Sequence, residues 1–102
     1  MRDEKVITVL IVDDHPVVRE GLRAVLSLEA DMQVVVEIGT GEDALAVIPE
    51  FRSAVVLMDL LLPDISGVEV IRRICATSAD IAFLVLSTHI RKYDDVLFAS
   101  IR

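Results

Sequence analysis

Short, predominantly apolar runs recur along the chain, and each has the length of a β-strand. They occupy residues 6–12, 32–38, 54–58 and 81–86. A run such as 6–12, which is apolar at successive rather than alternate positions, is typical of a strand buried on both faces, as in a parallel sheet. Parallel neighbours need a crossover connection, usually a helix, so the runs predict an α/β fold in which strands and helices alternate.

Segments with helical periodicity separate the first three runs. Pro16 fits the first turn of a helix, where the missing N–H of proline costs no hydrogen bond. That helix has an apolar stripe made of Val18, Leu22, Val25 and Leu26. Thr40 precedes Asp43 by three residues, which predicts an N-terminal helix cap. The capped helix has an apolar face made of Ala44, Leu45 and Ile48.

A third helix is predicted after the apolar loop at 60–65. Ser66 and Glu69 have the spacing of a capping box. We assign the apolar face of this helix to Val68, Ile71 and Cys75, with Cys75 packed in the core. A fourth helix is expected over residues 93–101. The resulting order predicts a doubly wound parallel sheet with right-handed crossovers.

Acidic and hydroxyl side chains follow the apolar runs. Asp13 and Asp14 come after the first run, Asp59 after the third and Ser87 after the fourth. The carboxyl ends of parallel strands meet at one edge, where ligands bind in such sheets. Neighbouring carboxylates repel, and their oxygens suit Mg²⁺, Mn²⁺ or Ca²⁺ rather than zinc. A carboxylate also attacks phosphorus in covalent catalysis, which makes Asp59 a candidate phosphate acceptor.

Simpler interpretations exist for the same residues. An Asp-Asp pair after a strand often marks only a turn or the start of a helix. His15 is a candidate general base, although we expect a partly exposed loop residue. The combined pattern favours a site, because each acid follows a strand of the parallel type.

Composition limits the classes of function. The chain has 102 residues, the length of one domain, and 10 Lys+Arg against 17 Asp+Glu give a net charge of −7. An acidic domain is by itself a poor ligand for nucleic acid or anionic membranes. Cys75 is the single cysteine, which excludes an intrachain disulfide. No apolar run approaches the roughly 18 residues of a membrane span. We therefore expect a soluble, cytoplasmic domain that makes no membrane contact.

Three segments resemble the motifs of bacterial response-regulator receiver domains. Residues 9–22, VLIVDDHPVVREGL, resemble the opening of these domains, most of all in the NarL/FixJ subfamily. Residues 57–67, LMDLLLPDISG, resemble the phosphoacceptor segment D-x-x-x-P-x-x-x-G, and residues 85–89, VLSTH, resemble the Ser/Thr switch segment. The likeness covers essentially the whole chain. It implies a flavodoxin-like (CheY-like) fold with strand order 2-1-3-4-5.

The resemblance also implies roles for individual residues. Asp59 would accept a phosphoryl group from a sensor histidine kinase. Asp14, Asp59 and the backbone carbonyl of Leu61 would bind Mg²⁺ directly, and Asp13 largely through water. Ser87 would respond to the phosphate as the switch residue. Members of this subfamily regulate transcription through a C-terminal helix-turn-helix domain of LuxR type, so DNA binding is expected of a parent protein only.

One departure from the family pattern has several consequences. Receivers continue into a fifth strand that ends in a lysine, and then a fifth helix, whereas this sequence ends at Arg102 before both. Residues 1–102 are thus expected to form a C-terminally incomplete receiver without the lysine contact to phosphate. The fourth strand would then be an open apolar edge, which predicts self-association by strand pairing or segment exchange. Alternatively, the sequence is part of a longer chain.

No enzymatic activity is expected of a phosphoacceptor module. Three other functions are alternatives to it. A phosphohydrolase with an aspartyl nucleophile typically has a second acid two residues later, where this chain has Leu61. A flavodoxin-like cofactor carrier needs a phosphate loop after the first strand, where Asp13 and Asp14 would repel phosphate. A degenerate receiver, which binds partners without phosphorylation, stays open as the alternative.

Overall fold

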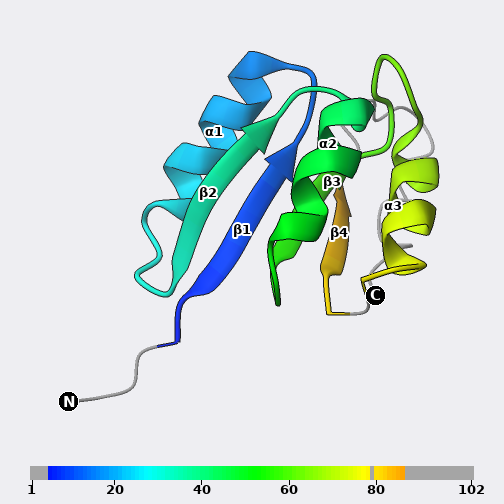
Figure 1. The fold of residues 1–102 in the computed structure, drawn as a ribbon. Helices are drawn as coiled ribbons and strands as arrows, with labels where there is room; N and C mark the ends of the chain where they lie inside the picture. The colour runs from blue at the N-terminus through cyan, green and yellow to red at the C-terminus, as the bar shows by residue number, and fades with distance from the viewer. Residues whose placement is uncertain (1–4, 79, 87–102) are drawn as a thin grey trace.

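A parallel sheet with helices on both faces forms the body of the protein (Figure 1). The computed structural model describes residues 5–78 and 80–86. Their elements are β1 (Ile7–Val12), α1 (Pro16–Leu26), β2 (Met32–Ile38), α2 (Gly41–Val47), a 3₁₀ helix η1 (Ile48–Glu50), β3 (Val55–Asp59), α3 (Gly67–Cys75) and β4 (Ala82–Leu86). This alternation confirms the predicted α/β class.

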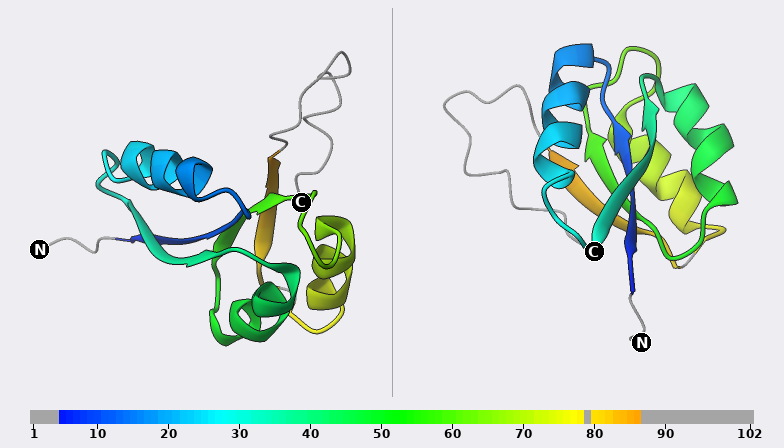
Figure 2. Two further views of the ribbon diagram at one scale, coloured as in Figure 1. Left: turned by 90° about the horizontal axis from the view of Figure 1, so that it is seen from above. Right: turned by 90° about the vertical axis from the view of Figure 1, so that its left-hand side faces the viewer.

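The four described strands lie in the order β2-β1-β3-β4, and every neighbouring pair is parallel. Helix α1 covers one face of the sheet, and α2 and α3 cover the other, as the view from above shows (Figure 2). This is the predicted doubly wound arrangement with order 2-1-3-4. The order reverses next to β1, so the carboxyl ends of β1 and β3 form the edge where a ligand is expected.

The two faces of the sheet have separate apolar clusters. The larger cluster consists of buried residues of β1, β3 and β4 that pack on α2 and α3. It includes Leu10, Val56, Met58, Val70 and Phe83. The smaller cluster, on the α1 side, consists of Val9, Ile11 and Leu57, with Leu22 and Leu26 of α1 packed against it. The strands are thus apolar on both faces, as the sequence predicts.

Strand β2 has an irregularity that the sequence did not predict. Val9 pairs with Val34, but Leu10 pairs with Val36, so Val35 is an extra residue on β2. An extra residue reverses which face the following side chains occupy. The acidic side chain of Glu37 therefore lies on the α1 side of the sheet, where it meets arginines of α1.

The predicted apolar faces of α1 and α3 were partly wrong. In α3 the buried residues are Gly67, Val70 and Ile74, whereas Val68 and Cys75 are exposed. Gly67 determines this face, because it packs directly on the backbone after β3. Glycine has no side chain, so the pattern of apolar residues does not reveal this contact. In α1, Val25 is exposed, and the stripe reduces to residues four apart in the sequence, Val18, Leu22 and Leu26.

Two predicted helix caps are confirmed. The side chain of Thr40 accepts a hydrogen bond from the amide of Asp43 at 3.1 Å, and that of Ser66 accepts one from the amide of Glu69 at 3.2 Å. The expected helix at 93–101 and the switch residue Ser87 lie outside the described residues. Within those residues, none of the helices is long and apolar enough to cross a membrane.

A carboxylate in the loop after β3 fastens that loop to the start of α2. Oδ1 and Oδ2 of Asp64 accept hydrogen bonds from the amides of Gly41 and Glu42, each at 2.8 Å. The bond from the Gly41 amide, followed in effect by that from Glu42, lowers the pKa of Asp64. The ionised form of Asp64 therefore stabilises the folded state.

We predict that Asp64→Asn destabilises the protein at pH 7, because an amide binds these backbone donors less well than a carboxylate. A lowered pKa gives stability that is present above the unfolded-state pKa of about 3.9 and is lost as the pH falls through the folded-state value. The loss of thermal stability caused by the substitution should therefore be smaller below about pH 4 than at pH 7. Thermal unfolding at pH 7 and pH 3 measures it, with Asp31→Asn as the control for an exposed acid. An equal difference at both pH values would contradict this role.

Candidate metal centre

The acids that follow β1 and β3 meet at the carboxyl edge of the sheet. Val12 pairs with Met58 in the parallel register, so the next residues, Asp13 and Asp59, continue side by side. Ligand atoms of Asp13, Asp14, His15 and Asp59 all lie within 4.8 Å of one another. The structure thus brings together the three acids that the sequence singled out, along with a histidine.

Most polar atoms of Asp13 form hydrogen bonds. Its amide donates to the carbonyl of Ile38 at the end of β2 at 2.9 Å, and its own carbonyl accepts from Nη1 of Arg19 at 2.6 Å. Its Oδ1 accepts from the amide of His15 at 2.8 Å. Its Oδ2 is buried and accepts no hydrogen bond from any residue that the structure describes. An unpaired buried carboxylate oxygen is costly, so this atom suits a role as a cation ligand.

Asp59 is the last residue of β3 and is fully buried. Its Oδ1 accepts a hydrogen bond from the amide of Leu61 at 3.0 Å, so the chain that follows the strand turns back to orient the carboxylate. The structure thus brings Leu61 to the site through its amide. The metal contact that we expected from the Leu61 carbonyl stays a prediction.

Gly67 allows α3 to approach the backbone next to Asp59. The amide of Gly67 donates to the carbonyl of Leu60 at 2.8 Å. A Cβ at position 67 would lie 2.6 Å from the carbonyl oxygen of Asp59 and 2.7 Å from Cα of Leu60. Both distances are far below normal contact, and both atoms belong to the backbone. Glycine is therefore required here for a close approach, not for an unusual backbone angle.

Asp14 and His15 form the more open side of the cluster. Their side chains are 30% and 45% exposed. Nδ1 of His15 lies 3.0 Å from Oδ1 of Asp13 and 3.1 Å from Oδ1 of Asp14. The hydrogen bond to Asp13 raises the pKa of His15, and the charge of Asp14 raises it further. His15 is thus a partly exposed residue, as expected, and its ring also contacts both acids, which was not predicted.

The donor set fits a hard divalent cation. Asp13, Asp14 and Asp59 provide carboxylate oxygens, two of these side chains are fully buried, and their mutual repulsion needs an opposite charge. Oxygen ligands of this kind are typical of Mg²⁺ sites, where one or two carboxylates share the ion with water and phosphate. The arrangement therefore supports cation binding and, with Asp59, phosphoryl chemistry.

Sequence reasoning missed Arg19, whose guanidinium contacts the backbone of Asp13. A weak signal was present. In its own helix Arg19 has no acid three or four residues away, the spacing at which helical ion pairs form, so its partner had to come from another element. That partner is Glu37 on β2, with Nε of Arg19 3.5 Å from Oε1 of Glu37.

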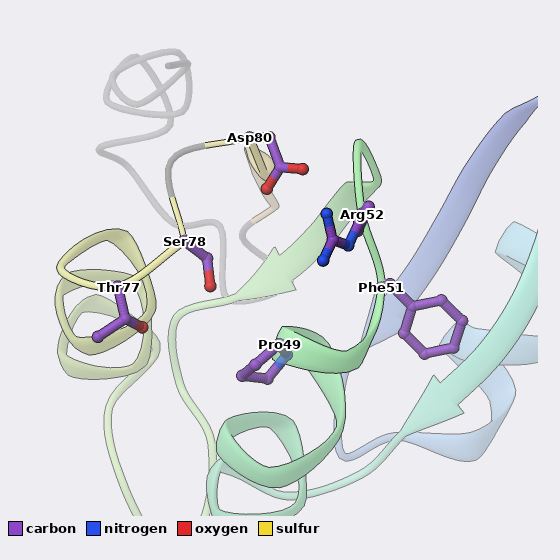
Figure 3. A pocket seen from close by; sticks show the side chains of 6 residues that line it. All are labelled: Pro49, Phe51, Arg52, Thr77, Ser78 and Asp80. Carbon is purple, nitrogen blue, oxygen red and sulfur yellow. The ribbon is translucent and has the colours of Figure 1, made fainter.

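A separate pocket of about 400 Å³ lies at the opposite edge of the sheet (Figure 3). It is lined by Pro49, Phe51, Arg52, Thr77, Ser78 and Asp80, which precede β3 and β4 in the chain. Its two charged side chains, Arg52 and Asp80, have opposite signs, and Oδ2 of Asp80 already accepts a hydrogen bond from the amide of Ser53 at 3.1 Å. This lining favours no ligand class over another.

Comparisons with known proteins agree with the geometry. Residues 9–99 match the family described as the response regulator receiver domain. The chain is 43% identical over 83 residues to the transcriptional regulatory protein UhpA of Salmonella typhimurium, a match that covers 81% of this chain and 41% of that protein. The chain thus spans less than half the length of this curated relative.

Solved structures give the same picture. A LuxR-family two-component response regulator from Aurantimonas sp. SI85-9A1 superposes with a TM-score of 0.76 at 29% identity, covering 90% of this chain and 66% of that one. RcsB from Salmonella enterica serovar Typhimurium, bound to the promoter rprA in the presence of the phosphomimetic BeF3⁻, has a TM-score of 0.77 at 27% identity. That match covers 93% of this chain and 81% of that one.

We predict that Gly67→Ala destabilises the protein by about 1–3 kcal/mol, the usual cost of overpacking, because the new Cβ meets rigid backbone. The matched control is Gly21→Ala in α1, where an added Cβ meets nothing within 4 Å. That control should stabilise the protein by up to about 1 kcal/mol through helix propensity. Urea denaturation measures both variants. Equal effects at the two glycines would refute the close approach of α3 to Asp59.

Proposed function

This chain is a member of the response regulator receiver domain family, of the NarL/FixJ type, and we propose that it accepts a phosphoryl group on Asp59 with Mg²⁺ as cofactor. The observation that supports this most is the convergence of Asp13, Asp14 and Asp59 at one edge of the sheet, with ligand atoms within 4.8 Å of one another. We propose these three acids as the metal ligands, with Asp13 acting largely through water.

In the proposed reaction, a carboxylate oxygen of Asp59 attacks the phosphorus of a phosphohistidine on a sensor kinase. A P–O bond to Asp59 forms, the P–N bond breaks, and the imidazole of the kinase keeps the electron pair. The Leu61 amide orients the Asp59 carboxylate for this attack. A cation held by Asp13, Asp14 and Asp59 would offset negative charge on the transferring phosphoryl group. No side chain of this domain is needed as a general base, because the attacking oxygen carries no proton.

We assign two further roles that the family pattern suggests. The Leu61 carbonyl would complete the metal ligands, and it belongs to the residue whose amide donates to Asp59. Ser87, which lies outside the described residues, follows β4 in the sequence and provides the hydroxyl that responds to phosphate.

The proposed context is a longer cytoplasmic regulator of transcription. The chain spans 41% of UhpA and 37% of DegU from Brevibacillus brevis, both called transcriptional regulatory proteins. We propose that residues 1–102 are the receiver part of such a protein, which binds DNA through a separate C-terminal helix-turn-helix domain. Its upstream partner is a sensor histidine kinase.

Incubation with acetyl phosphate and Mg²⁺, followed by intact-mass measurement, tests the phosphoacceptor. We expect an adduct of one phosphoryl group on the wild-type chain. The adduct should be absent in Asp59→Asn, because an amide is a poor nucleophile, and absent when a chelator removes the metal. Asp43→Asn, an exposed acid at the start of α2, is the matched control and should retain the adduct.

Two results of this experiment would count against the proposal. An adduct that persists in Asp59→Asn would place the acceptor elsewhere. A wild-type chain that binds Mg²⁺ but gains no phosphoryl group would favour a degenerate receiver, which interacts with partners without phosphorylation.

We also propose self-association through β4. Among the described residues, β4 pairs only with β3, so this part of the chain provides no second strand for the other edge of β4, which has apolar side chains. Light scattering over a wide concentration range should therefore show a mass that rises with concentration. Leu84→Lys, a charge placed on this edge, should reduce the rise, because charged side chains oppose strand pairing. A constant monomer mass for the wild-type chain would exclude this interface.

A further inference from the structure

We propose that Arg19 is a positioning residue of the metal centre. Its guanidinium holds the backbone of Asp13 and thereby restrains the Asp13 carboxylate at the proposed metal site. This inference rests on the proposed Mg²⁺ site but goes beyond it, because Arg19 touches neither the metal nor the phosphoryl group in the proposed reaction.

The contacts around Asp13 show what Arg19 adds. The amide of Asp13 is held by the Ile38 carbonyl at 2.9 Å, and Oδ1 is held by the His15 amide at 2.8 Å. The carbonyl of Asp13 is held by Nη1 of Arg19 at 2.6 Å. Without Arg19 the peptide between residues 13 and 14 loses this restraint, while the contacts of the Asp13 amide and Oδ1 remain.

The end of β2 is built to hold the arginine in place. The carboxylate of Glu37 forms an ion pair with Arg19, whose Nε lies 3.5 Å away and makes no hydrogen bond with the described residues, and Oε2 of Glu37 accepts a hydrogen bond from Nε of Arg23. The extra residue Val35 is what turns Glu37 to the α1 side. Gly39 leaves room for the guanidinium, since a Cβ there would lie 3.3 Å from Nη1 of Arg19. Three consecutive residues, 37–39, thus support Asp13, two of them through Arg19.

Electrostatics alone predicts the opposite effect. A guanidinium near a divalent cation repels it, so removing the charge of Arg19 would tighten Mg²⁺ binding if charge dominated. Glu37, which Arg19 shares with Arg23, offsets part of this charge, and the hydrogen bond to the Asp13 carbonyl is short and involves a charged donor, which makes it strong. The effect of geometry should therefore exceed the effect of charge, and loss of Arg19 should weaken Mg²⁺ binding. The sign of the change separates the two explanations.

Calorimetric titration with Mg²⁺ of four versions of the chain tests this. The versions are wild type, Arg19→Met, Arg19→Lys and the matched control Arg23→Met. We expect both Arg19 variants to bind about 10-fold more weakly or worse, as is usual when a group that orients a metal ligand is removed. Lysine keeps the charge, but its ammonium nitrogen stands one bond short of the position of Nη1 and should not reach the Asp13 carbonyl, so it should not rescue. Arg23 shares Glu37 but does not contact Asp13, and its loss should change affinity by less than about 2-fold.

A second readout separates positioning from a general loss of structure. At saturating Mg²⁺, phosphorylation of the Arg19 variants by acetyl phosphate should return to the wild-type rate, because the cation then holds the acids itself. Circular dichroism at the titration temperature confirms that each variant is folded.

Several results would overturn the inference. These are unchanged or tighter Mg²⁺ binding by Arg19→Met, wild-type affinity in Arg19→Lys, an equal loss in Arg23→Met, or a slow rate that persists at saturating Mg²⁺. A wild-type chain that binds no Mg²⁺ would overturn the proposed function and this inference together. A wild-type chain that binds Mg²⁺ beside variants with unchanged affinity would overturn the inference alone.

Discussion

The parallel register between β1 and β3 decides where the charges of this protein lie. Val12 pairs with Met58, so Asp13 and Asp59 leave the sheet next to each other at the same edge. A slip of one residue would turn every side chain of one strand to the opposite face, exchanging the residues of the two apolar clusters and separating the acids. The buried residues on both faces prevent such a slip. The apolar core and the acidic site are thus consequences of one alignment, and neither forms without the other.

By bringing the acids together, this alignment lowers the stability of the folded protein at the carboxyl edge of the sheet. Two fully buried carboxylates beside a third acid and next to an apolar sheet raise the free energy of the metal-free protein. The chain offsets part of that cost with local hydrogen bonds, from the His15 amide to Asp13 and from the Leu61 amide to Asp59. These donors are neutral and cannot cancel the net charge. A divalent cation bound as proposed would offset this charge, so the proposal implies a stability that rises with metal concentration.

The sequence predicted the parts of this arrangement that follow from local pattern. The strands, the helix caps at Thr40 and Ser66, and the convergence of Asp13, Asp14 and Asp59 all follow from apolar runs and strand polarity. It failed where a contact between distant segments decides. The buried face of α3 is set by Gly67 against the backbone of β3, and a residue without a side chain leaves no trace in an apolar pattern. The extra residue in β2 was equally invisible, because a run of valines fits either register.

The missed features share one place in the structure, since Gly67, Arg19 and the part of β2 after its irregularity all restrain the backbone around the acids rather than the acids themselves. A carboxylate on a loop is useful to a metal only if its oxygens are held within a few tenths of an ångström, and burial alone does not provide that precision. Here the restraint comes from three directions: α1 through Arg19, β2 through the Ile38 carbonyl, and α3 through its approach to Asp59. Cation binding or phosphorylation at this edge would therefore act on α1, β2 and α3 at once. These contacts connect the site directly to elements at the surface of the protein.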